Sequence, residues 1–271
     1  MIEKKISSRS NKEFLFLKKI ISSVKFRYEQ KMYWIEGEKN IKTFCRVGNK
    51  DLIQKIIVTE ETKYIIQEKF LSGINADILV LTKDLYDEIS LISTHFKVGT
   101  LVAHEKLGNI QVSPTPGNVI YLHNIQDPGN LGTILRTCSS FNFTQIWISK
   151  SSVDPWSPKV IRSSAGYHCL LKIVIFENFD DVFKMSRKYK LQTFLIDTNK
   201  EGSSLLTTNL EGKNNLFLFG TEGKGFPIEL KEKYQFNDTL SIPQNSMVDS
   251  LNLAVAVSIC LYESFRQNQM S

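Results

Sequence analysis

Residues 124–137 have the sequence NIQDPGNLGTILRT, and this stretch decides the fold. It follows Val119 to Leu122, a short apolar run that is typical of a strand. Asp-Pro-Gly is turn chemistry, and Asn130 is expected to cap the helix that follows. Arg136 stands among apolar neighbours, so we expect a buried guanidinium with a planar anionic partner such as phosphate. The pattern predicts a nucleotide-handling site, and the alternative is an ordinary turn whose arginine pairs with a core carboxylate.

Two later runs support the same interpretation. Residues 216–219 (LFLF) form an apolar strand that leads into 220–227 (GTEGKGFP). Residues 240–243 (LSIP) lead through a polar loop to 248–256 (VDSLNLAVA). In this order and context, the three runs resemble the three motifs of the SpoU-type branch of the SPOUT methyltransferases, which transfer methyl from S-adenosylmethionine to RNA. The resemblance covers the chain from about residue 118 to residue 265.

The rest of the chain carries further parts of the resemblance. Residues 154–159 (DPWSPK) and 162–166 (RSSAG) look like the segment that joins the first two motifs of the family. Residues 35–37 (IEG) and 99–103 (GTLVA) resemble the substrate-binding domain that precedes many of these enzymes, which is similar to ribosomal proteins that bind bent RNA. The expected domains are an RNA substrate-binding domain (1–106), a linker (107–117) and a SPOUT methyltransferase domain (118–271).

Hydrophobic periodicity indicates an α/β fold. Short apolar strands are expected near residues 32–35, 56–59, 78–81, 100–103, 119–123, 145–149, 171–176, 192–196, 216–219 and 239–242. Helical stretches alternate with them, which predicts largely parallel sheets. We expect Ser10 and Glu13 to cap the first helix. The last helix, from Val248 to Gln267, is apolar nearly all round in its first half and needs cover from its own core or from another subunit. The resemblance adds a deep trefoil knot in the C-terminal parallel-sheet domain.

Composition narrows the class of protein. Of 271 residues, 42% are hydrophobic and 23% charged, as in globular proteins that dissolve in water. Four scattered cysteines without a CxxC pair argue against a metal site or a disulfide scaffold and for a reducing compartment. No apolar segment resembles a signal peptide or is long enough to span a bilayer. We therefore expect a cytoplasmic protein with no membrane partner. No GxGxG or GxxxxGK[ST] motif follows a strand, which disfavours an ordinary Rossmann methyltransferase or a P-loop NTPase.

The net charge of +6 is unevenly distributed. Residues 1–50 hold 13 Lys and Arg against five Asp and Glu, whereas the remainder holds 21 against 23. Such a basic region predicts a surface that binds RNA or DNA. The alternative is a solvated helix face that keeps the protein soluble.

The resemblance also implies site residues. The polar active-site positions are Asn130, Arg136, Glu222, Ser250 and Asn252. The cofactor S-adenosylmethionine is expected to be held by backbone groups of Gly220, Ile242 and Leu251, with Glu222, Gly223 and Asn252 beside it. Gly220, Gly223 and Gly225 are expected to take positive φ and let the backbone approach the ligand; the alternative is a plain loop. For Ser250 and Asn252 the alternative role is helix capping. No metal site is expected.

Arg136 matches the arginine that is proposed in this family to help deprotonate the ribose 2′-hydroxyl. A guanidinium is a poor base because it hardly loses its proton in proteins. We therefore favour a phosphate clamp that orients the nucleotide and stabilises the developing alkoxide. If Arg136 does act as a base, a neighbouring phosphate must assist.

The resemblance implies a homodimeric RNA ribose 2′-O-methyltransferase that acts on rRNA or tRNA and pairs through its C-terminal domain. Two alternatives remain open from the sequence. One is a base methyltransferase on the same knotted fold, and the other is a non-catalytic RNA-binding or ribosome-assembly factor. His123 and His168 are expected to be structural, since a lone histidine near apolar strands is more often a satisfied core residue.

Overall fold

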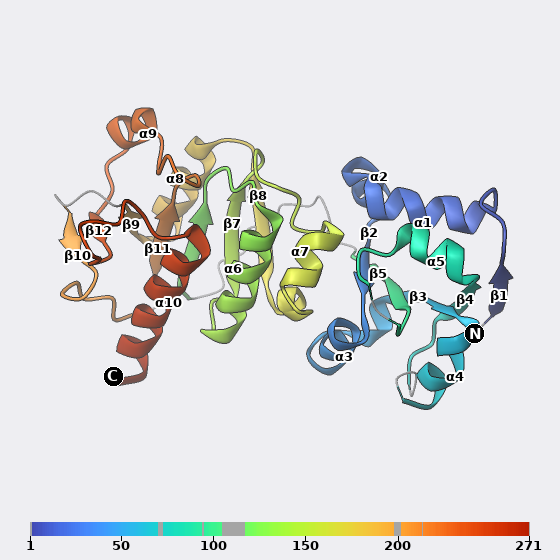
Figure 1. Ribbon diagram of the computed structural model, residues 1–271. Helices are drawn as coiled ribbons and strands as arrows, with labels where there is room; N and C mark the ends of the chain where they lie inside the picture. Colours follow the sequence, from blue (N-terminus) through green and yellow to red (C-terminus); the bar gives the residue numbers. More distant parts are fainter. Residues whose placement is uncertain are drawn as a thin grey trace. The chain divides into compact units, whose positions relative to one another are not determined.

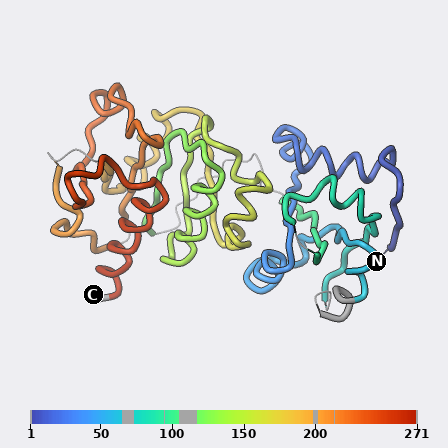
Figure 2. The backbone as a smooth tube through the Cα atoms, viewed as in Figure 1, coloured from blue at the N-terminus to red at the C-terminus, as the bar shows by residue number. Residues whose placement is uncertain are grey.

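The computed structural model describes residues 2–69, 73–93, 95–104, 117–197, 202–212 and 214–270. The chain folds into two compact units (Figures 1 and 2). One unit comprises residues 1–109 together with 154–169, and the other comprises residues 110–153 together with 170–271. The expected linker, residues 107–117, lies outside the described residues except for Gly117.

Within the described residues, the first unit holds a five-stranded sheet in the order β1-β4-β3-β5-β2. Its strands are β1 (Glu3–Ile6), β2 (Met32–Glu36), β3 (Ile53–Thr59), β4 (Asp77–Leu81) and β5 (Val98–Ala103). β1, β4 and β3 are parallel, but β5 is antiparallel to both β3 and β2. The expectation of a largely parallel sheet is therefore wrong for this unit. Apolar periodicity locates strands but not their direction, and here β5 starts at the end of the sheet where β4 stops.

Helices of the first unit cover this sheet. They are α1 (Lys12–Ser22), α2 (Val24–Gln30), α3 (Glu38–Val47), the short 3₁₀ turn η1 (Lys50–Leu52), α4 (Glu60–Lys69) and α5 (Lys83–Ile89). α1 and α5 pack Phe14, Leu17 and Tyr86 against Trp34 of β2. The cap of α1 is Asn11, whose side chain accepts a hydrogen bond from the backbone N of Glu13, at 2.9 Å. The expected capping box of Ser10 and Glu13 is therefore wrong, because the cap is the next residue, Asn11.

Residues 154–169 belong to the first unit although they follow β7 of the second. They contain α7 (Pro158–Ser163), which contacts β2, and the start of η2 (Tyr167–Leu170). The buried guanidinium of Arg27 donates to Asp154 Oδ2, with Nη2 at 2.6 Å and Nε at 2.9 Å. Arg27 also donates to the carbonyl oxygen of Ile20, at 2.7 Å. A charge that is paired and hydrogen-bonded in this way can be buried at acceptable cost.

The described part of the second unit holds a seven-stranded sheet in the order β10-β12-β9-β11-β6-β7-β8, in which every pairing is parallel. Its strands are β6 (Val119–Leu122), β7 (Gln145–Ser149), β8 (Lys172–Phe176), β9 (Gln192–Ile196), β10 (Ser203–Ser204), β11 (Asn215–Phe219) and β12 (Asp238–Ser241). Its helices are α6 (Pro128–Ser140), α8 (Phe179–Lys188), α9 (Ile228–Lys233) and α10 (Leu253–Met270). The predicted parallel-sheet domain is confirmed.

Parallel topology places the loops of the three predicted motifs at the same end of the strands. β12, β9, β11 and β6 are successive neighbours, so their carboxyl ends lie along one edge of the sheet. The loops that begin at residues 123, 197, 220 and 242 all start from this edge. Ligands of open parallel sheets bind at such an edge. α6 and α10 lie side by side in the same unit (Figure 1).

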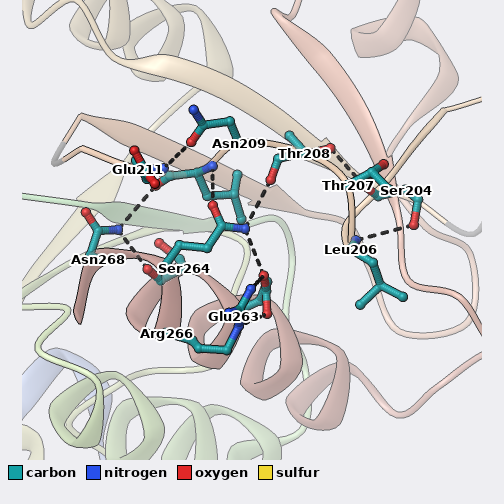
Figure 3. Close-up of polar contacts among 12 residues, drawn as sticks. Ser204, Leu206, Thr207, Thr208, Asn209, Glu211, Glu263, Ser264, Arg266 and Asn268 are labelled. Carbon is teal, nitrogen blue, oxygen red and sulfur yellow. Dashed lines mark hydrogen bonds and ion pairs between the residues drawn. The ribbon is translucent and has the colours of Figure 1, made fainter. Parts of the chain in front are cut away.

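Side chains near the C-terminal end of α10 form hydrogen bonds with the loop that precedes β11 (Figure 3). Gln267 accepts a hydrogen bond from the backbone N of Leu210, at 2.7 Å, and donates to the carbonyl oxygen of Thr208, at 3.1 Å. Asn268 accepts from the backbone N of Gly212, at 2.9 Å. These side-chain bonds pair backbone groups of a loop that lacks regular structure, which is otherwise costly where water is excluded.

His168 makes the stability of the first unit depend on pH. Its ring is fully buried between the hydroxyls of Ser164, at 3.2 Å, and Tyr33, at 3.1 Å. Burial, with a smaller contribution from His104, lowers the pKa of His168 from 6.5 to about 3. The native ring therefore stays neutral where the unfolded chain takes up a proton, so the free energy of unfolding falls as the pH drops from 6.5 toward 3.

We expect this one site to remove about 2 kcal/mol of stability between pH 7 and pH 5, because each pKa unit corresponds to about 1.4 kcal/mol. The check is denaturant unfolding at both pH values for the wild type and for His168→Gln, which cannot titrate. The variant should lose less stability over this interval than the wild type does. Equal losses in the two proteins would contradict the assignment.

Candidate functional site

The first motif contains the start of α6. Asp127 caps this helix, and its Oδ1 accepts a hydrogen bond from the backbone N of Asn130, at 2.7 Å. Asn130 was expected to be the cap, which is wrong. Pro128 occupies the first turn, where its missing N–H costs nothing, and the cap therefore falls on the residue before it. The amide of Asn130 is consequently available for contacts with other segments.

Asn130 joins all three motifs. Its Nδ2 donates to Glu222 Oε1, at 2.7 Å, and its Oδ1 accepts from Asn252 Nδ2, at 3.2 Å. Glu222 lies in the loop after β11, and Asn252 immediately precedes α10. Three of the five predicted polar positions are thus brought into direct contact from segments about 90 and 120 residues away from Asn130.

Ser250 and Asn252 are close in the chain but differ in their contacts. Ser250 is exposed, and its hydroxyl forms no hydrogen bond with any other described residue. Asn252 does cap α10, because its Oδ1 also accepts from the backbone N of Ala254, at 2.9 Å. The capping alternative therefore holds for Asn252, which combines it with the contact to Asn130, and does not hold for Ser250.

Arg136 is exposed on α6, so the expectation of a buried guanidinium is wrong. It shares a helix face with Thr133 and Ser140, which are also exposed, whereas Ile134 and Leu135 point into the core. Its guanidinium forms no hydrogen bond or ion pair with another residue in the described part of the chain. An exposed and unpaired cation of this kind can meet a partner from outside the chain.

The glycine-rich loop after β11 is closed by its own backbone. Thr221 N donates to Gly225 O, at 2.8 Å, and Gly225 N donates to Thr221 O, at 3.2 Å. Gly223 and Gly225 have φ of +79° and +70°, as expected. Gly220 does not have positive φ, which corrects the expectation. A Cβ on Gly220 would lie 2.0 Å from the carbonyl carbon of Gly225, so glycine here permits closure of the loop.

Two backbone positions of the predicted cofactor site lack protein partners. Ile242 and Leu251 are half-buried, and their backbone groups form no hydrogen bond with any other residue that the structure describes. Backbone N–H and C=O groups that are shielded from water are nearly always paired in folded proteins. These groups therefore fit a ligand with hydrogen-bonding edges, such as a nucleoside.

Other titratable side chains near the site have structural surroundings. His123 bonds through Nδ1 to the hydroxyl of Tyr121, at 3.0 Å, and its ring faces Phe226. Burial lowers the pKa of His123 and raises the pKa of the buried thiols of Cys138 and Cys260. The described residues contain no cluster of three side chains that could hold a metal ion. They also include no helix with the length and apolar character needed to cross a bilayer.

Residues 117–262 match the SpoU rRNA Methylase family. The chain belongs to this family. The resemblance drawn from the three motifs is thereby confirmed.

Individual relatives agree with this assignment. An uncharacterized tRNA/rRNA methyltransferase from Synechocystis is 38% identical over 148 residues, which are 55% of this chain and 53% of that protein. The 23S rRNA (guanosine(2553)-2′-O)-methyltransferase of Bacillus subtilis is 25% identical and covers 96% of this chain and 98% of its own length. The chain thus spans about half of the first relative and nearly all of the second.

Solved structures share the fold. The AdoMet-bound rRNA methyltransferase from Sinorhizobium meliloti superposes with a TM-score of 0.79 at 23% identity. The match covers 97% of this chain and 98% of that one, so the fold is shared along both units.

Sequence reasoning missed two residues at this edge of the sheet. Asp127 caps α6, and Asp197 follows β9 at the carboxyl edge, where the motif loops also begin. Both could have been found. Pro128 signals a cap one residue earlier, and a carboxylate directly after a buried parallel strand is a recognised signal for this edge.

Proposed function

We propose that this protein transfers a methyl group from S-adenosylmethionine to the 2′-hydroxyl of a ribose in rRNA or tRNA. The observation that carries the proposal is the contact of Asn130 with Glu222 and Asn252, which assembles one polar site from the three motifs of the family. The names of relatives point the same way, since the Bacillus subtilis protein is a 2′-O-methyltransferase of 23S rRNA.

The cofactor fits the second and third motif loops. Backbone groups of Gly220, Ile242 and Leu251 would bind its adenine and ribose, and two of these positions have no protein partner among the described residues. Gly223, where a Cβ would meet nothing within 4 Å, and the polar side chains of Glu222 and Asn252 would lie beside it. When bound, the cofactor supplies an electrophilic methyl group.

The chain's own residues would orient the acceptor nucleotide. Arg136 would bind a phosphate of the nucleotide through its planar fork and stabilise negative charge on the 2′-oxygen. We assign it no role as a base, because guanidinium groups are poor bases in proteins. The hydroxyl of Ser250 and the amide of Asn130 would hold the ribose in line for transfer.

The first unit would bind the RNA. Lys12 and Lys19 lie one above the other on the exposed side of α1, and Lys31 ends α2. None of the three forms an ion pair with another described residue, whereas Lys5 pairs with Glu60. Unpaired cations on one unit supply the contacts to phosphate on which RNA affinity depends. In this proposal residues 1–106 are the substrate-binding domain and 118–271 the methyltransferase domain, although residues 154–169 of the latter pack with the first unit.

The second unit would form a homodimer through α10. Val255, Ile259 and Tyr262 occupy one face of this helix and are 47%, 37% and 53% exposed. Apolar side chains in such a row favour burial against a second copy with C₂ symmetry. A second copy would thus cover the part of the apolar helix that its own core leaves exposed.

We further propose that the loops after β11 and β12 form the trefoil knot of the family. The meeting of Glu222 and Asn252 at Asn130 supports this path. An experimental structure in which residues 242–252 do not thread a loop would disprove it. We place the protein in the cytoplasm, because Cys45, Cys138, Cys169 and Cys260, all within the described residues, are unpaired thiols.

The function is tested by mapping ribose and base methylation across total RNA from a deletion strain and its parent. One or more ribose methyl groups should be lost and then restored by the wild-type gene. Loss of a base methyl group would favour the base methyltransferase alternative, and no loss would favour a non-catalytic factor. Arg136→Ala should fail to restore the mark, since removing one transition-state donor costs about 10²–10³ in rate.

The same variant separates catalysis from cofactor binding. Arg136→Ala should bind S-adenosylmethionine as the wild type does in calorimetry, because Arg136 is exposed and pairs with nothing that the structure describes. Arg136→Lys should recover little activity, since a point charge lacks the planar fork. Arg187→Ala, at an exposed arginine on α8, is the matched control and should keep full activity. A lysine variant with normal turnover would refute the clamp.

Lys12→Ala/Lys19→Ala should weaken RNA binding and make it less sensitive to salt, because each lysine that binds a phosphate adds about one to the salt slope. Filter binding across a salt series measures this. Lys5→Ala is the control, because Lys5 is already paired with Glu60. An unchanged slope in the double variant would mean that these cations only solvate the helix.

Val255→Glu and Ile259→Glu should convert the dimer to a monomer and leave the fold intact, because both side chains are exposed within one chain. Sedimentation at micromolar concentration is the measurement, with circular dichroism to check folding. Ile228→Glu, at an exposed position of α9, is the control and should stay dimeric. A wild type that sediments only as a monomer would sink this part of the proposal.

A further inference from the structure

Asp197 occupies a central place at the carboxyl edge of the second sheet. It directly follows β9, which lies between β11 and β12, and its backbone N donates to Leu240 O, at 3.0 Å. Its side chain is only 12% exposed. The carboxylate is therefore held between the strands from which the second and third motif loops emerge.

The two oxygens of this carboxylate face different elements. Oδ2 accepts a hydrogen bond from Lys231 Nζ on α9. Oδ1 lies 3.9 Å from the point where a side chain on Gly225 would begin. Asp197 thus stands between α9 and the glycine-rich loop that precedes it.

The glycine-rich loop depends on both of its ends. One end follows β11, and the Thr221–Gly225 bridge closes the loop on itself. The other end runs through Pro227 into α9, a helix of six residues that contains no fully buried side chain. Leu230 packs against the apolar core of this unit but is only partly buried, so the partly buried ion pair adds to what holds the helix against the sheet.

We propose that Asp197 and Lys231 form a positioning pair that holds the glycine-rich loop in the shape that binds the cofactor. The pair ties α9 to β9, and through α9 it fixes the loop's exit beside Gly225. This inference rests on the proposed function, because it assigns the loop to S-adenosylmethionine. The pair acts through the loop and need not touch the cofactor.

α9 itself supplies a matched control. Lys233, two residues further on, pairs with Asp180 Oδ1 at the start of α8, at 2.9 Å. That pair is 58% and 51% exposed, against 31% and 12% for Lys231 and Asp197. An exposed pair contributes little, and this one does not involve β9 or the loop.

The test measures cofactor binding by calorimetry for single variants of both pairs. Lys231→Met and Asp197→Asn should each raise the Kd for S-adenosylmethionine about fivefold, as expected for loss of a partly buried charged hydrogen bond. Lys233→Met should leave the Kd within about twofold of the wild type. The KM for cofactor should rise with the Kd, while kcat at saturating cofactor and the affinity for RNA should stay near wild type.

A double-mutant cycle distinguishes a positioning pair from two separate roles. The double variant Asp197→Asn/Lys231→Met should bind cofactor no worse than either single variant, because the two residues act as one unit. Lys231→Arg should keep near-normal affinity by preserving the charged contact. Thermal unfolding of each variant identifies any that fails to fold, and the single variant that does fold then carries the comparison with Lys233→Met.

Three results would overturn the inference. They are additive effects in the cycle, equal effects at Lys231 and Lys233, and a loss of affinity in Asp197→Asn alone, which would mean that the carboxylate binds cofactor directly. A wild type that binds no S-adenosylmethionine would instead refute the proposed function. The two failures are therefore distinguishable in one set of titrations.

Discussion

The candidate site depends on the two hydrogen bonds of the Asn130 side-chain amide. The amide donates to Glu222 and accepts from Asn252, so a single side chain sets the spacing of three loops. A primary amide can do this because it offers a donor and an acceptor on the same small group. Its orientation is fixed in turn by the cap at Asp127, which holds the first turn of α6.

The second unit could be predicted well from sequence because its strands are short apolar runs separated by turn residues. The exposure of single side chains, the position of a helix cap and the contacts between loops in this unit were harder to predict. Arg136 follows two core residues in the chain, but the helical period turns it toward Thr133 and Ser140 and away from the core. Applying that period would have predicted its exposure. The capping shift from Asn130 to Asp127 was likewise readable from Pro128, whereas the contact between Asn130 and Glu222 was not, since it depends on how strands pair.

The first unit shows where sequence reasoning stops. Residues 154–169 were assigned by resemblance to the connecting part of the methyltransferase domain, yet they pack into the first unit through Trp156 and the Arg27–Asp154 pair. No local sequence pattern indicates that residues 154–169 pack with the first unit, because this packing depends on burial against strands more than a hundred residues away in the chain. A cut near residue 105 would leave Asp154 and several apolar side chains without their partners. The two units are consequently not modules that can be separated at one point in the chain.

The hydrogen bonds made by residues at both ends of α10 have a consequence for the order in which the protein folds. Asn252 lies ahead of this helix and Gln267 and Asn268 near its end, and all three follow every strand of the sheet in the chain. During synthesis the sheet can therefore form before either the polar site or the loop at residues 204–212 is secured. A nascent chain would therefore carry a formed sheet and an open polar site until α10 emerges, and the contact of Asn252 with Asn130 would be among the late steps of assembly.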